Sequence, residues 1–158
     1  MTTIYLETLI NAPLQICFDL SRSIDLHQVS TVKTKERAVG GRTQGLIEKG
    51  EQVTWEAVHF GVRQNLTVKI TDMKSPEFFT DEMQKGAFKS MWHEHRFTEL
   101  DGKTLMTDVF KFEAPLGFLG ILAEKLFLKK YMTGFLIERN EVIKKVAESG
   151  EWERVLAV

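Results

Sequence analysis

The stretch MWHEHRFTELDGKTLMTDVFKF, residues 91–112, contains two runs of alternating polar and apolar residues on either side of Asp101-Gly102. An Asp-Gly pair between two such runs is the strongest local signal for a two-residue hairpin turn. A turn of this length fixes the register of the whole hairpin, and it places His95 directly opposite Asp108. The stretch therefore predicts an antiparallel hairpin whose paired residues can be counted from the turn.

One face of this hairpin is apolar except for three polar side chains. The alternation assigns to this face Met91, His93, His95, Phe97, Met106, Asp108, Phe110 and Phe112. Directly opposed side chains have Cβ atoms about 4.5–5.5 Å apart, so we expect the His95 imidazole to contact the Asp108 carboxylate. A buried carboxylate without a partner costs several kcal/mol, which makes this contact nearly obligatory.

The His95–Asp108 pair has three interpretations. It is a core pair that fixes the register of the hairpin, or it orients a polar group of a molecule bound in a cavity. Alternatively, it acts as a general acid or base, because an aspartate beside a histidine sets the tautomer of the ring. No nucleophile is placed beside the pair, so His95 and Asp108 are candidates and not assigned catalytic residues.

The motifs predict neither a metal site nor a cofactor. His93 and His95 are separated by about 7 Å at the backbone, since they are two residues apart on a strand. No HxxxH, HExxH or cysteine spacing typical of a metal site occurs. The glycine-rich loop at residues 40–45 lacks the GxxxxGK[ST] spacing of a phosphate-binding loop.

Residues 53–73 predict a second hairpin around Phe60-Gly61. A two-residue turn there pairs Trp55 with Leu66 and again leaves one face largely apolar. That face carries Val53, Trp55, Ala57, His59, Val62, Gln64, Leu66, Val68 and Ile70.

Five shorter elements complete the N-terminal part and the sheet. Residues 4–10 alternate as a strand, two short helices follow up to about residue 32, and a short strand is expected near residues 34–39. Residues 77–85 form another strand, for which two registers stay open. Its inner set is either Phe79 and Met83 or Phe78 and Thr80.

Residues 117–149 predict one long C-terminal helix, because apolar residues recur there at steps of three and four. Its first half, FLGILAEKLFL, is apolar around most of its circumference, whereas its second half is narrowly amphipathic. The apolar stretch is far shorter than the roughly 20 residues that a bilayer-spanning helix requires. We therefore expect no integral membrane segment.

Length and composition indicate a single domain over residues 1–158, with 43% hydrophobic residues and a formal net charge of −1. The mixed charges give no positive field that would attract nucleic acid. Cys17 is the only cysteine, and the N-terminus has no basic leader before an apolar run. We expect a cytoplasmic protein, and the pattern leaves its oligomeric state open.

The order of elements resembles the START-like, polyketide-cyclase superfamily, known as SRPBCC, whose fold is the helix-grip. The resemblance covers Ile4 to about Glu148, and it is carried by INAPLQICFDL, GEQVTWEAVHFGVRQNLTVKITDM, FKSMWHEHRF and DGKTLMTDVFKFEAPLGFLG. Within the superfamily, these stretches are similar to a bacterial branch of ligand-binding proteins of undefined activity. The resemblance implies an α+β fold in which a curved antiparallel sheet wraps around the long helix.

The resemblance also implies a hydrophobic cavity between sheet and helix. Its ligand-binding residues would be Trp55, His59, Leu66, Met91, His93, His95, Phe97, Met106, Asp108 and Phe110, with Phe118, Leu122 and Leu126 as a lid.

Three functions fit this fold. The first is binding of a hydrophobic or aromatic small molecule, and the second is a cyclase or dehydratase that uses His95 and Asp108 to move a proton. The third is a co-chaperone-like interaction domain acting through an exposed face with Trp92, Arg96 and Val109.

Overall fold

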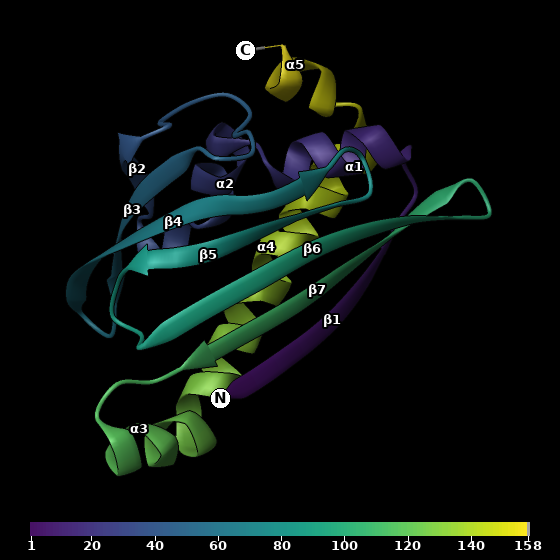
Figure 1. The fold of residues 1–158 in the computed structure, drawn as a ribbon. Helices are drawn as coiled ribbons and strands as arrows, with labels where there is room; N and C mark the ends of the chain where they lie inside the picture. The colour runs from purple at the N-terminus through teal and green to yellow at the C-terminus, as the bar shows by residue number, and fades with distance from the viewer. Residues whose placement is uncertain (158) are drawn as a thin grey trace.

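A computed structural model describes residues 1–157, and Figure 1 shows how their elements are arranged. The strands are β1 (Thr2–Ile10), β2 (Arg37–Gly41), β3 (Gln52–His59), β4 (Val62–Lys74), β5 (Phe78–Lys85), β6 (Ser90–Leu100) and β7 (Lys103–Glu113). The helical elements are α1 (Leu14–Ser21), α2 (Ile24–Ser30), the 3-10 turn η1 (Val32–Thr34), α3 (Gly117–Ala123), the π-helical turn η2 (Glu124–Leu128), α4 (Lys129–Ser149) and α5 (Trp152–Leu156).

One seven-stranded antiparallel sheet forms the framework, in the order β1-β7-β6-β5-β4-β3-β2. The sheet curves around α4, which crosses its concave face, and α1 and α2 cover the same face at one end (Figure 1). This arrangement confirms the predicted α+β helix-grip architecture of one strand, two short helices, six consecutive antiparallel strands and a C-terminal helix. No helix among residues 1–157 is long and apolar enough to span a membrane.

Both predicted two-residue turns are present. Asp101 and Gly102 have φ values of 51° and 76°, and Phe60 and Gly61 have values of 52° and 74°. Positive φ at both central residues is the geometry of a type I′ turn, which matches the twist of the flanking strands. The resulting register pairs His95 with Asp108 in one hairpin and Trp55 with Leu66 in the other, as predicted.

The register of β5 settles the choice between its two possible inner sets. Phe79 pairs with His95 and Asp81 pairs with His93, so these side chains share the concave face. The Phe79–Met83 set is therefore the inner one, and it carries a carboxylate, Asp81, at its centre. Two register shifts between β4 and β5 explain why simple alternation from the preceding hairpin left this strand ambiguous.

Residues 117–149 are helical throughout, as the periodicity predicted, but they do not form one regular α-helix. The π-helical turn η2 separates α3 from α4. Glu124, at the start of η2, is buried, and its carboxylate accepts hydrogen bonds from the Thr2 hydroxyl and the Ala114 backbone amide. These long-range contacts tie the segment to β1 and to the end of β7, and α3 projects past the end of the sheet (Figure 1).

The hydrophobic core lies beneath α1 and along α4. Phe18 packs edge-on against Phe79 and Phe97, with ring centroids 5.7 and 5.5 Å apart. Met106 is fully buried at the same place, where its sulfur contacts the Ser21 hydroxyl. This end of the concave face is therefore filled with side chains.

Candidate functional site

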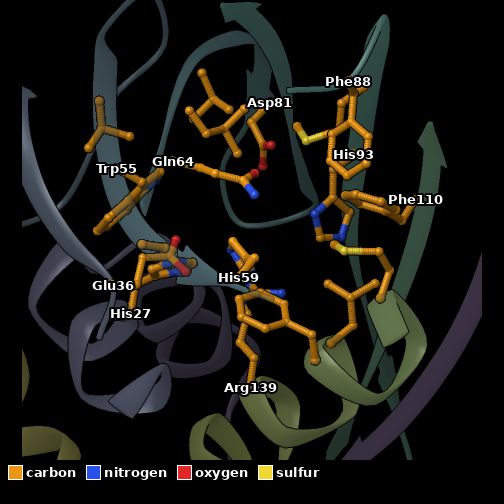
Figure 2. Close-up of a pocket in the computed structure, with 18 of the residues that line it drawn as sticks. His27, Glu36, Trp55, His59, Gln64, Asp81, Phe88, His93, Phe110 and Arg139 are labelled. Carbon is orange, nitrogen blue, oxygen red and sulfur yellow. The ribbon is translucent and has the colours of Figure 1, made fainter. Parts of the chain in front are cut away.

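A cavity of about 320 Å³ lies between the concave face of the sheet and α4. Residues from both hairpins and from α4 line it, and Figure 2 shows eighteen of them. Seven of the residues predicted to bind a ligand are on its walls: Trp55, His59, Leu66, Met91, His93, His95 and Phe110. The helix contributes Tyr131, Met132, Phe135, Leu136 and Arg139.

Two predicted wall residues lie in the core and not at the cavity. Phe97 and Met106 are on the predicted face of the hairpin, and both are buried. They are nearest the Asp101-Gly102 end of that face, where α1 packs against the sheet and fills the space. The prediction of a cavity wall was wrong for these two residues, because it did not include the helix that covers them.

The predicted lid does not exist. Phe118, Leu122 and Leu126 are 78%, 45% and 69% exposed, and none of them lines the cavity. At the π-helical turn η2 the chain changes direction, so that α3 runs past the end of the sheet and does not cover the cavity (Figure 1). The roof is formed instead by α4 itself.

Asp108 lies behind the cavity wall at the centre of a buried polar cluster. It is fully buried, and its Oδ1 lies 2.8 Å from Nε2 of His93. The predicted contact with His95 is present as a longer approach of 3.2 Å between Nδ1 and Oδ1. The shorter bond to the carboxylate therefore belongs to His93, and this histidine faces the cavity (Figure 2).

Asp81 holds the other side of His95. Its Oδ2 is 2.8 Å from Nε2 of His95, and the His95 ring stacks on Phe79 with centroids 4.2 Å apart. The rings of His93 and His95 are also close, with centroids 3.7 Å apart. The two histidines occupy consecutive inward positions of β6. Their rings are much closer to each other than the roughly 7 Å that separates their backbone positions.

Arg139 and Asn140 complete the cluster from α4. The Arg139 guanidinium lies 3.2 Å from Nδ1 of His95 and 3.5 Å from Oδ1 of Asp108. The Asn140 amide donates to Oδ2 of Asp108 at 2.6 Å. Both residues are buried, so this part of the helix is held to β7 by polar contacts.

The cluster shifts the pKa values of its members in opposite directions. Burial lowers the pKa of His93 to about 4, and the neighbouring His95 adds to this shift. Burial alone would raise the pKa of Asp108, but the hydrogen bond with His93, the neighbouring His95 and the charge of Arg139 hold it well below its ordinary value. The pKa of Asp81 is likewise lowered against the effect of burial, mainly by the bond with His95. At neutral pH, His93 is uncharged and both carboxylates are ionised.

A second histidine–carboxylate pair faces the opposite side of the cavity (Figure 2). Ser23 caps α2 by accepting from the Leu26 amide, and the helix then presents His27 to the cavity. Nε2 of His27 lies 2.8 Å from Oε1 of Glu36, and its ring stacks obliquely on Trp55 at 4.1 Å.

His59 lies near the Phe60-Gly61 turn and has no carboxylate bonded to it among residues 1–157. Its Nδ1 is 2.7 Å from the Tyr131 hydroxyl of α4, and burial lowers its pKa.

Sequence reasoning missed Asp81, Arg139, Asn140, His27 and Glu36. The signal for two of them was available, because Arg139 and Asn140 lie three and four residues after Leu136 and so share its inner stripe. Asp81 lies between Phe79 and Met83, but the open register hid its orientation. His27 and Glu36 are brought together by loops, and no periodic pattern predicts their contact.

No protein-family model matches this sequence, and no curated protein matches it. Solved structures do resemble it. A protein of Thermus thermophilus aligns with 99% of this chain and 98% of its own, at a TM-score of 0.74 and 17% identity. Major latex-like protein 151 from Panax ginseng covers 92% of this chain and 97% of its own, at a TM-score of 0.68 and 15% identity.

A START superfamily protein from Mycobacterium smegmatis aligns with 93% of this chain and 97% of its own, at a TM-score of 0.68 and 11% identity. The structural similarity establishes the architecture, whereas sequence identities this low leave ligand and activity open. The chain therefore has the START-like, helix-grip fold.

Proposed function

We propose that this chain binds a small hydrophobic or aromatic molecule in the cavity between the sheet and α4. The observation that carries the proposal is the cavity of about 320 Å³, whose exposed wall surface is mainly apolar and whose ionisable groups include two histidine–carboxylate groups on opposite sides. Ligand sites in proteins are typically concave and apolar, with a small number of polar groups that orient the ligand.

The size of the cavity favours a compact ligand. Ligand pockets span about 300–1,000 Å³, and this cavity is near the lower limit of that range. Its walls include Phe79, Phe88, Phe110 and Met91, whose flat or flexible side chains pack well against rings. A molecule of one or two rings is therefore a better fit than a long acyl chain.

The polar end of the cavity favours a ligand that carries a hydroxyl group. His93 donates from Nε2 to Asp108, which leaves Nδ1 of the neutral ring as an acceptor, and no bond to Nδ1 exists among the described residues. Asp81 supplies carboxylate oxygens beside it. Two neighbouring acceptors at one end of an apolar cavity select a hydrogen-bond donor on the ligand.

An acid–base enzyme of the cyclase or dehydratase type is the second candidate, and the contacts of His95 favour it. The two ring nitrogens lie 2.8 Å from Asp81 and 3.2 Å from Asp108. Nε2 of His95 would reach a ketone substrate only by exchanging its bond with Asp81 for one to the substrate, and the two carboxylates would stabilise the protonated ring during the proton transfer. A His95→Asn variant that still binds its ligand but has lost turnover would support this candidate.

Fluorescence of N-phenyl-1-naphthylamine, an apolar probe, tests binding directly. Ala57 lines the cavity and is buried, so an Ala57→Phe change fills part of the space. We expect saturable probe binding by the wild-type protein and roughly tenfold weaker binding by Ala57→Phe, a loss of about 1.4 kcal/mol. Arg63→Phe, an exposed change on the neighbouring strand, is the matched control and leaves affinity unchanged.

Native mass spectrometry of protein purified from cells complements the probe, because it shows a co-purifying apolar molecule as added mass. If the wild-type protein binds neither the probe nor such a molecule, the proposal is wrong. The interaction-domain alternative would then be favoured.

A further inference from the structure

Three side chains with metal-binding atoms converge at the sheet side of the cavity. Asp81, His93 and His95 each offer one such atom, and these atoms all lie within 4.8 Å of one another. The sheet register produces this convergence, because Asp81 pairs with His93 and the two histidines are consecutive on the inner face of β6. All three residues line the cavity, so an ion held by them would be open to it.

Asp108 lies behind both imidazoles, close to one nitrogen of each ring. Its Oδ1 is 2.8 Å from Nε2 of His93 and 3.2 Å from Nδ1 of His95. Histidines that bind a metal usually donate their second N–H to a carboxylate or carbonyl, which fixes the tautomer and raises the basicity of the metal-binding nitrogen. With Nε2 of His93 bonded to Asp108, its Nδ1 lone pair is free on the cavity side.

The contacts of His95 are not all satisfied by one neutral tautomer. If Nε2 carries the proton, it donates to Asp81 at 2.8 Å, and Nδ1 accepts from Arg139 at 3.2 Å. Nδ1 then also faces the Asp108 oxygen at 3.2 Å, which is a contact between two acceptors. A metal ion on Nε2 moves the proton to Nδ1, so the contact with Asp108 becomes a hydrogen bond and the hydrogen bond from Arg139 to Nδ1 is lost. Arg139 keeps its contacts with Asp108 and Asn140.

We propose that Asp81, His93 and His95 bind one divalent transition-metal ion at the wall of the cavity. Two imidazoles and one carboxylate suit zinc, cobalt, nickel or ferrous iron, whereas magnesium and calcium prefer oxygen ligands alone. Three protein ligands leave further coordination positions open to the cavity, as in catalytic metal sites. This inference does not rest on ligand binding by the cavity, and a metal ion on His93 Nδ1 and Asp81 would take the place of a ligand hydroxyl at these two groups.

The charges around the site favour a dication. Asp81 and Asp108 supply two negative charges and Arg139 one positive charge, so the cluster carries one net negative charge when both imidazoles are neutral. The guanidinium reduces the attraction for a cation but does not cancel it. A bound dication is attracted by the two carboxylates, and it changes the net charge of the cluster from −1 to +1.

Titration with Co²⁺ tests the proposal on the full chain after treatment with a chelator. Cobalt reports its ligands by visible absorption, and calorimetry with Zn²⁺ gives stoichiometry. We expect one equivalent of either ion to bind, and an Asp81→Asn or His93→Gln change to weaken binding by at least tenfold. Asp108→Asn, which alters the group behind the ligands, should weaken binding roughly 10–100-fold.

The His27–Glu36 pair provides the matched control. It has the same 2.8 Å contact and faces the same cavity, but it is not part of the converging cluster. Glu36→Gln should therefore bind Co²⁺ as the wild-type protein does. Circular dichroism and N-phenyl-1-naphthylamine binding show whether each variant keeps its fold and cavity, which separates a failure of this proposal from a failure of ligand binding.

X-ray absorption at the cobalt edge of the wild-type protein gives an answer even if a variant does not fold. Two imidazoles and at least one oxygen ligand are expected in the first coordination shell. The proposal is overturned if the wild-type protein takes up no stoichiometric Co²⁺, if the spectrum lacks two imidazoles, or if folded Asp81→Asn binds as tightly as Glu36→Gln.

Discussion

The two sides of the cavity each present histidine to carboxylate at 2.8 Å, yet the two groups differ in how they are supported. His27 and Glu36 come from a short helix and a loop, and the His27 side chain is 20% exposed. The residues of the cluster around Asp108 come from three neighbouring strands and a helix, and the Asp108 side chain is fully buried. Equal distances therefore do not imply equal roles: the number of converging groups and their burial decide what each can do.

Removing the Asp108 carboxylate should give the largest effect. Asp108→Ala leaves His93 and Asn140 without their buried acceptor, and breaking a buried charged pair typically costs about 3–5 kcal/mol. Urea unfolding in the presence of a chelator measures this loss. Asp108→Asn keeps the volume and one acceptor oxygen, so its loss should be smaller. If Asp108→Ala costs no more than Glu36→Ala, the contrast between the two groups does not hold.

Arg139→Met should lower stability and strengthen metal binding together. The change removes donors to Asp108 and His95, which reduces the free energy of unfolding by about 1–3 kcal/mol. It also removes the positive charge nearest the proposed ion, so the affinity for Co²⁺ should rise. Arg139→Lys retains the charge and should leave that affinity close to the wild-type value. A purely structural cluster would show the stability loss without any gain in affinity.

Glu36→Gln should have a small effect on stability. The bond with His27 is partly exposed, and the amide can still accept from Nε2, so we expect a change of about 0–1 kcal/mol. Urea unfolding of Glu36→Gln and of Asp108→Asn measures the loss of stability on each side of the cavity, since each variant replaces a carboxylate by an amide of the same shape. A loss as large as that of Asp108→Asn would show that the His27 side is as tightly built as the Asp108 side.

His59 should give a weak dependence of stability on pH. Burial lowers its pKa in the folded chain, with Glu36 opposing this shift and Tyr131 as the bonded neighbour. The unfolded chain therefore binds a proton more readily, and the contribution of His59 to stability declines as pH falls through 6.5, its ordinary pKa. His59→Gln should remove this part of the slope between pH 7 and pH 5 in urea unfolding. If the dependence of stability on pH is the same in His59→Gln as in the wild-type protein, burial of His59 is not its cause.

The hairpins could be predicted from sequence because their turns are local. Asp101-Gly102 and Phe60-Gly61 fix register through backbone geometry alone, and the opposition of His95 and Asp108 follows by counting. The inward position of Asp81 could not be predicted in the same way, because two register shifts interrupt the pairing of β4 with β5.

The C-terminal segment was harder to predict because distant contacts decide its shape. The helical periodicity along residues 117–149 is continuous, so it does not reveal the π-helical turn η2. The bonds of Glu124 to Thr2 and Ala114 hold it there, and they join parts of the chain that sequence patterns do not connect. The side chains that the resemblance implied as a lid lie in α3 and η2, and they are exposed.

The tight turn at Asp101-Gly102 limits how this hairpin can vary during evolution. A single residue inserted between His95 and the turn would move His93 and His95 to the outer face, since successive strand residues point to opposite sides. A loss or gain of two residues on one strand would keep both histidines on the concave face, but it would shift the register so that they no longer lie beside Asp108. Only matched length changes on both strands keep the cluster intact, so related chains should differ in the length of this hairpin by equal numbers of residues on β6 and β7.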